Sequence, residues 1–247
     1  MTTILGASVS GMIQNQTVMD SVANNLANVN TFAFKKTRTV AEGVPDNTAA
    51  ADGSRLGVAQ TTTDLIFNPA AVQRTDDNLQ FSIQDDTFFP VQDTDGSTVY
   101  TRLGDLSSDG AGNITAIGGR LLQPPVQVPA GMTSPAIDAN GVITAIDSTG
   151  TAQPIGQITL TRFTNAQGLQ AVGSGLYRDT VNTGATTTGT PGSPGFATIM
   201  PGTLEGSNVD TAEEFTNMLI AQRAYQASLK SFTIGDEMLQ VATNLTH

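Results

Sequence analysis

Residues 211–242 read TAEEFTNMLIAQRAYQASLKSFTIGDEMLQVA, and this stretch decides the fold class. Within it, apolar or aromatic side chains recur every seven residues, at Met218, Tyr225, Phe232 and Leu239. That spacing indicates an amphipathic helix, and it is close to the spacing of a coiled-coil seam. Further apolar side chains widen the same face: Phe215, Leu219, Leu229 and Ala242. The sequence therefore predicts a long C-terminal helix with a broad apolar face.

The start of this helix is marked by capping residues. Asp210 or Thr211 provides a side-chain oxygen for the first free backbone N–H groups, and Thr211 with Glu214 matches a capping box. Glu213 and Glu214 stand in the first turn, where the helix dipole favours negative charge. We therefore expect the helix to begin near residue 210.

A second helix pattern opens the chain, with Leu5, Met12, Met19 and Leu26 at intervals of seven residues. Neighbouring apolar positions complete the stripe: Val9, Val22, Ala23 and Val29. An isolated helix is marginally stable, so each terminal helix needs a packing partner. The periodicity fits a hairpin within one chain and equally a pair that also packs against copies of itself.

Between the helices the chain is rich in short β-prone runs. They lie at residues 79–83, 87–91, 98–101, 142–146 and 157–161. Turn dipeptides separate them, at Asp95-Gly96, Asp109-Gly110, Asn140-Gly141 and Thr149-Gly150. Such runs and turns are typical of antiparallel hairpins. The low-complexity sequence TTTGTPGSP, between Gly184 and Gly195, is expected to be a flexible return segment.

These patterns together predict an α+β protein, in which paired N- and C-terminal helices flank an antiparallel β-rich middle domain. The terminal helices form a coiled-coil-like inner domain from residues 1–36 and 205–247. Residues 37–75 lack sustained periodicity and are expected to be an extended connector. Residues 76–204 are expected to form the β-rich outer domain.

Composition excludes several kinds of partner. The 247 residues include 22 acidic and 11 basic side chains, and the net charge of −11 opposes binding to nucleic acid or to anionic membranes. Charged residues make up only 13% of the chain, and such a sparsely charged polar surface suits close packing between subunits. We expect no cleaved signal peptide and no membrane insertion, because residues 1–12 lack a basic region and no stretch approaches the roughly 20 apolar residues of a membrane span.

A search for catalytic chemistry finds almost no candidates. The chain has no cysteine, and its single histidine is the last residue, His247. The sequence Asp93-Thr-Asp95-Gly96 resembles the start of a calcium loop, but the later ligands are missing, so a hairpin turn is the better interpretation. Residues 6–11 have the glycine spacing of a phosphate loop without its Lys and Ser/Thr. We therefore predict no catalytic, cofactor or metal site, and no enzyme activity.

Two sequence motifs stand at opposite ends of the chain. The N-terminal motif comprises Asn24, Asn25, Leu26, Ala27, Asn28, Thr31, Phe34 and Lys35. The C-terminal motif includes Asn208, Val209, Gln222, Arg223, Ala224 and Tyr225. Together they resemble the signatures of the bacterial flagellar rod and hook axial family, whose N-terminal pattern is ANNLANxxTxGFK. One position departs from the pattern, because Ala33 stands where the family has glycine.

The middle of the chain is also similar to this family. Its matching motifs are TFFPV (87–91), YTRLG (100–104), GGRLL (118–122), ITLTRF (158–163) and LY (176–177). In this order they are most similar to the distal-rod member. The proximal-rod member shares both terminal signatures and is the alternative.

The resemblance implies a structural subunit that polymerises helically into a hollow shaft. Such a shaft transmits torque from motor to hook and lines an export channel. The implied partners are copies of itself, other rod proteins, the hook protein, the surrounding basal-body rings and the type III export apparatus. The implied location is the basal body, across the periplasm, with export that needs no cleaved signal. No cofactor is implied.

We expect helix contacts within and between subunits at one set of positions: Leu5, Met12, Met19, Leu26, Phe215, Met218, Tyr225, Leu229, Phe232 and Leu239.

A carbohydrate-binding β-domain of the cell envelope, clamped by a helical hairpin, is an alternative from another functional class. Sugar sites usually stack on exposed aromatic rings, and this chain has no Trp and only 3 Tyr.

Overall fold

The computed structural model of this chain describes residues 2–45 and 55–244. Its chain divides into two compact units. The helical unit comprises Met1–Val29, Lys36–Ile66 and Val209–His247, and the β unit comprises Asn30–Lys35 and Phe67–Asn208. Both terminal helices are therefore in one unit and the β-rich middle is in the other, as the α+β prediction requires.

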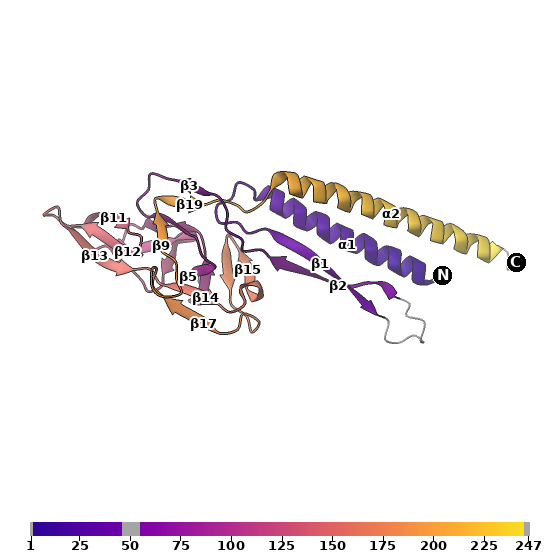
Figure 1. The fold of residues 1–247 in the computed structure, drawn as a ribbon, viewed down its shortest axis with the longest axis horizontal. Coiled ribbons are helices and arrows are strands. Elements are labelled where there is room, and N and C mark those ends of the chain that lie inside the picture. The colour runs from indigo at the N-terminus through magenta and orange to yellow at the C-terminus, as the bar shows by residue number, and fades with distance from the viewer. Residues whose placement is uncertain (1, 46–54, 245–247) are drawn as a thin grey trace. The chain divides into compact units, whose positions relative to one another are not determined.

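The helical unit is built on two long antiparallel helices, α1 (Thr2–Ala27) and α2 (Thr211–Asn244), which lie side by side (Figure 1). Asp210 is the N-cap of α2, since its Oδ1 accepts hydrogen bonds from the backbone N–H groups of Ala212 (2.8 Å) and Glu213 (3.1 Å). The predicted start near residue 210 is thus confirmed.

A two-stranded ribbon completes the helical unit, where the sequence predicted an extended connector. Strands β1 (Thr37–Pro45) and β2 (Arg55–Leu65) pair antiparallel, from Thr37 opposite Leu65 onward, and both strands contact α1. The sequence did not indicate this strand pairing, because residues 37–75 lack sustained periodicity. Strand pairing and packing on α1 stabilise the ribbon, and neither requires the alternating apolar pattern that marks a strand in sequence.

The β unit contains a branched nine-stranded sheet, two three-stranded sheets and the two-stranded sheet β19-β3. The large sheet has the order β15-β16-β6-β5-β10-β9-β8, and β14 joins it by pairing with both β5 and β17. The three-stranded sheets are β11-β12-β13 and β18-β4-β7. The strand bounds are β3 Val72–Arg74, β4 Gln80–Ile83, β5 Thr87–Gln92, β6 Thr98–Thr101, β7 Gly104–Asp105, β8 Ser107–Ser108, β9 Ile114–Ala116, β10 Arg120–Leu122, β11 Thr133–Ile137, β12 Val142–Ile146, β13 Ala152–Gln157, β14 Leu160–Phe163, β15 Gln170–Gly173, β16 Leu176–Arg178, β17 Thr186–Gly189, β18 Ile199–Pro201 and β19 Thr203–Glu205.

Two local predictions in the β unit are wrong. The apolar run 157–161 is split, because β13 ends at Gln157 and β14 begins at Leu160, with the fully buried Ile158 between them. The expected flexible segment contains β17, whose Thr186–Gly189 backbone pairs with β14. Residues distant in sequence provide the partners in both places, so local composition does not reveal them.

Aspartate side chains organise the predicted hairpin turns. Asp147 Oδ1 accepts hydrogen bonds from the backbone N–H groups of Thr149 (2.7 Å) and Thr151 (3.1 Å), and Asp138 Oδ1 makes the same pair with Asn140 and Val142. These contacts satisfy backbone donors at the loop tips, which explains why aspartate precedes both glycine turns.

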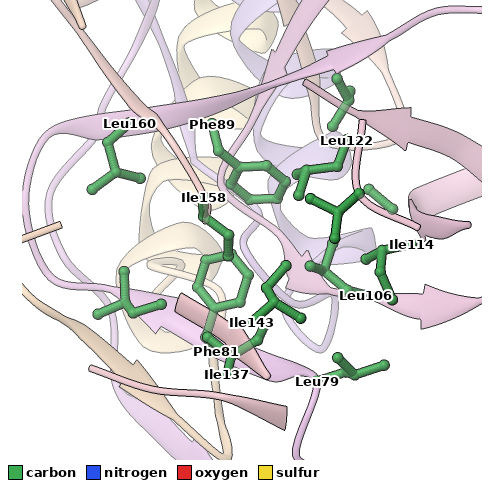
Figure 2. Close-up of a cluster of buried hydrophobic side chains, with 14 of the residues drawn as sticks. Leu79, Phe81, Phe89, Leu106, Ile114, Leu122, Ile137, Ile143, Ile158 and Leu160 are labelled. Carbon is green, nitrogen blue, oxygen red and sulfur yellow. The ribbon is translucent and has the colours of Figure 1, made fainter. Parts of the chain in front are cut away.

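The main core of the β unit gathers side chains from most of its strands. Phe81, Phe89, Ile143 and Ile158 converge there, each at most slightly exposed (Figure 2). Phe88, which points to the opposite face of β5 from Phe89, is also fully buried. It belongs to a second cluster of edge-to-face aromatic rings, formed with Phe67, Phe163, Tyr177 and Tyr100. Strand β5 is therefore covered on both faces.

None of the helices among the described residues is long and apolar enough to cross a membrane.

Replacing Gly104 by alanine tests the close pairing of β7 with β4. A Cβ at this position would overlap the carbonyl oxygen of Phe81, which is backbone and has little freedom to move. We expect Gly104→Ala to lower the free energy of unfolding by roughly 2 kcal/mol in a urea titration. Gly110→Ala is the control, because nothing lies within 4 Å of its added carbon. Equal stability of both variants would contradict the strand pairing.

Candidate assembly site

The ten helix positions predicted to make assembly contacts fall into two groups. The eight heptad positions are half-buried: Leu5, Met12, Met19, Leu26, Met218, Tyr225, Phe232 and Leu239. The remaining two are exposed in the single chain, Phe215 to 50% and Leu229 to 39%.

The exposed pair is part of a larger apolar surface on α2. This surface also includes Leu219, Ile220, Ile234, Met238 and Val241, each between 43% and 61% exposed. At 100° per residue, most of these side chains lie on the side of the helix opposite the heptad stripe. Helix α2 is therefore apolar both toward α1 and away from it, a pattern that marks an interaction surface.

The two helices approach each other closely. A Cβ added at Gly11 of α1 would lie 3.1 Å from Ser228 Oγ of α2. Near the other end of the pair, Val22 and Ala221 are buried. Small side chains at these positions allow the two backbones to pack tightly.

Asn25, a residue of the N-terminal signature, is a structural clamp in the helical unit. Its side chain is buried and binds both backbone groups of Thr37, accepting from N–H and donating to C=O at 2.9 Å each. Its Nδ2 also donates to Glu214 Oε2 at 3.3 Å. The side-chain amide thus joins α1, the first residue of β1 and the first turn of α2.

The Glu214 side chain accepts a hydrogen bond from Asn25 and does not form the predicted capping box. It is buried, and its carboxylate meets α1 through Asn25. The prediction of a Thr211–Glu214 box is therefore wrong, because tertiary packing recruits the side chain that the local motif would use. The neighbouring Glu213 is exposed and pairs with Lys36 Nζ at 2.9 Å.

The β unit contains a buried ion network around Glu205. One carboxylate oxygen accepts from Lys35 Nζ at 2.7 Å and the other from Arg102 Nε at 3.3 Å, and all three side chains are almost fully buried. Backbone groups satisfy the remaining donors and acceptors: Ala70 N–H donates to Glu205, Lys35 donates to Asn68 O, and Arg102 donates to the carbonyl oxygens of Ile83, Asp85 and Thr87. A ring of neutral dipoles thus surrounds three buried charges.

Burial lowers the pKa of the Lys35 ammonium below its ordinary value, and the Arg102 guanidinium lowers it further. The Glu205 carboxylate acts in the opposite direction and favours the charged lysine. Two cations share one anion, so removing the Glu205 charge is expected to destabilise the network more than removing either cation.

Backbone hydrogen bonds tie the same segments together. Ala33 N–H donates to Glu205 O at 2.8 Å, and Asn208 N–H donates to Phe34 O at 3.4 Å. Ala33 has a φ of 55°, the left-handed conformation in which glycine carries no steric penalty. The departure from the family pattern at Ala33 therefore falls on a backbone position suited to glycine.

The other signature residues have several different environments. Phe34, Val209, Ala224 and Tyr225 are half-buried, whereas Asn24, Ala27, Thr31, Gln222 and Arg223 are exposed. Asn28, just after the end of α1, donates from its side-chain amide to Asn24. Arg102 stands in the YTRLG motif and Glu205 lies shortly before the C-terminal signature. An ionisable residue beside β-prone positions is the only sign of either role in the sequence.

Among the described residues, no group of His, Asp and Glu is arranged to hold a metal ion. His247 lies outside the described residues.

Family comparisons match three parts of the chain. Residues 5–35 match "Flagella basal body rod protein", residues 82–145 match "Flagellar hook protein FlgE/F/G D1 domain", and residues 200–245 match "Flagellar basal body rod FlgEFG protein C-terminal".

Three full-length relatives share one name. The flagellar basal-body rod protein FlgG of Bacillus subtilis is 36% identical, with 98% of each chain covered. The protein of the same name from Borreliella burgdorferi is 34% identical, over 98% of this chain and 97% of that one, and the one from Caulobacter vibrioides is 32% identical, over 98% of each.

Asn25→Asp tests the amide clamp with almost no change in shape. The new carboxylate would face Thr37 O and the Glu214 carboxylate, where the amide donates hydrogen bonds. We expect the free energy of unfolding of the helical unit, followed by helical circular dichroism in urea, to fall by about 2–3 kcal/mol. Asn24→Asp, on the exposed side of α1, is the matched control. If both variants unfold alike, Asn25 is no clamp.

Glu205→Gln tests the shared anion. It leaves Lys35 and Arg102 buried without a counter-charge, so we expect a loss of about 3–5 kcal/mol in the unfolding of the β unit. We expect Lys35→Met alone to lower the free energy of unfolding by less, since Glu205 and Arg102 remain a balanced ion pair. In the double variant, Lys35→Met is expected to recover part of the stability that Glu205→Gln removes.

The control for this double-mutant cycle is Glu213→Gln, an exposed carboxylate, with an expected change within about 0.5 kcal/mol. Simple additivity of Lys35→Met and Glu205→Gln would show that the two side chains do not depend on each other.

Proposed function

This chain belongs to the FlgG family of flagellar basal-body rod proteins and is a structural subunit of the distal rod, not an enzyme; we propose that its terminal helices make the contacts that join copies into the rod polymer. Because the chain belongs to this family, the alternative of a carbohydrate-binding β-domain is rejected. It also decides between the two rod proteins, because the full-length relatives above are all FlgG.

The observation that supports the proposal is the second apolar face of α2. Ile220 and Val241 are 61% and 59% exposed in the single chain, and Leu219 and Met238 are similar. A helix that packs only within its own chain needs one apolar stripe. The face directed away from α1 is accounted for when a neighbouring copy covers it.

The ten predicted contact residues then divide by role. The eight half-buried heptad positions form the seam between α1 and α2 of one chain. Phe215 and Leu229 contact a neighbouring subunit. Contacts of this kind sum along a polymer, since each Å² of apolar surface removed from water contributes roughly 25 cal/mol.

A shaft built in this way has the properties that its position requires. Summed helix contacts make it rigid enough to transmit torque from motor to hook, and the helical arrangement encloses a channel for export. Its other contacts are with neighbouring rod proteins, the hook protein, the basal-body rings and the type III export apparatus. The sparse surface charge supports this close packing, because few ions have to be desolvated when subunits meet.

Phe215→Asp combined with Leu229→Asp tests whether these two side chains contact a neighbouring subunit. Both positions are exposed in the single chain, so we expect circular dichroism and the unfolding transition of the monomer to change little. Polymer formation, measured by sedimentation of the full-length protein and by the recovery of complete rods in a complemented deletion strain, is expected to be lost.

Val172→Asp is the matched control, because Val172 is 41% exposed on β15 of the β unit. Normal rods from the double variant would exclude Phe215 and Leu229 from the assembly contacts. Normal hooks on normal rods in the deletion strain itself would refute the structural role.

A further inference from the structure

Helix α1 also presents an outward stripe. Its exposed residues recur at intervals of three and four, the spacing of a helix seam: Gly6, Val9, Ile13, Gln16, Asp20, Ala23 and Ala27. Most of them are small or apolar. Asp20 is the only charged residue in α1, so this stripe has one fixed negative charge at a defined height.

The outer face of α2 has the opposite charge at two heights. Arg223 and Lys230 are exposed there, one heptad apart. In the part of the chain that the structure describes, the ion pairs include neither of these cations, nor Asp20. All three charges are therefore available to a neighbouring molecule.

The contacts between α1 and α2 define the relative height of these charges. Gly11 lies level with Ser228, and Asn25 with Glu214, so Asp20 is level with Leu219 of its own α2. Arg223 lies four residues further along α2, about 6 Å away at 1.5 Å per residue. Lys230 lies eleven residues away, about 16 Å.

We propose that α1 of one subunit packs against the outer face of α2 of the next, displaced by about one helical turn, with Asp20 paired to Arg223. The inference rests on the proposed function and specifies the partner surface, a second copy of this chain. At this displacement Val9 faces Ile234 and Ala23 faces Ile220. Apolar side chains therefore meet on both sides of the ion pair.

The longer displacement, with Lys230 as partner, covers less of the exposed apolar face. It carries α1 toward the end of α2 and leaves Leu219 and Ile220 without a neighbour. Covering the α1 stripe with any surface that lacks a cation would bury Asp20 unpaired, which is costly. Charge and apolar area thus select the same register.

The two faces in contact are different surfaces of the molecule. Such heterologous contacts do not close on themselves unless the rotation between copies completes a ring, and otherwise they generate an open helical polymer. The pairing of Asp20 with Arg223 therefore gives each subunit one donor face and one acceptor face, as a growing rod requires.

Disulfide cross-linking tests the register directly, because the natural chain has no cysteine. Full-length protein with Asp20→Cys and Arg223→Cys, oxidised after assembly, is expected to give a ladder of covalent multimers on non-reducing gels. The matched control is Asp20→Cys with Lys230→Cys, which is expected to remain largely monomeric. A ladder from the control alone, or an intramolecular disulfide in the first variant, would overturn the register.

Charge reversal tests the ion pair. We expect Asp20→Lys or Arg223→Glu to raise the protein concentration needed for sedimentable polymer about tenfold, and the combination of both to restore it. Asp20→Lys with Lys230→Glu is expected to remain defective. If the single reversals assemble as the wild type does, the Asp20–Arg223 pair is wrong, but the proposed role in a polymer is unaffected. If the wild type itself forms no polymer, the proposed function is wrong, and the register with it.

Discussion

Glu205 carries the contact on which the β unit depends. Its single carboxylate balances Lys35, 170 residues earlier in the chain, and Arg102, 103 residues earlier. Because buried charges without a partner are strongly destabilising, these segments are stable only together. The first six residues of the β unit and its last strand are thereby held in one place, and the strands between them close around a common core.

Two residues of the N-terminal signature, Asn25 and Lys35, hold parts of the fold together. Asn25 uses its amide as a neighbouring strand would use its backbone, matching both polar groups of Thr37. Lys35 forms its ion pair with Glu205 inside the β unit. In contrast, three of the large exposed side chains of α2, Leu219, Ile220 and Ile234, stand outside the family motifs. Polar clamps need one residue type at one place, whereas an apolar surface needs only area.

The helical unit also explains how one chain serves as a subunit of a rod. Helix α2 has more apolar surface than α1 covers, and α1 presents a nearly uncharged stripe to solvent. Neither face is satisfied within the chain. A protein of this kind has its lowest free energy when copies cover one another, so polymerisation follows from the same hydrophobic effect that packs the helix pair.

Local sequence determined what depends on neighbouring residues: the two heptad helices, the start of the second helix near residue 210, the aspartate-glycine turns and the family. Tertiary structure decided whatever needs a partner distant in the chain. The β1–β2 ribbon, strand β17 and the split at Ile158 form through pairing across many residues, and Glu214 leaves its predicted cap to meet Asn25. Arg102 and Glu205 acquire their role only when folding buries them together, because a charge has no structural partner until the chain brings one within reach.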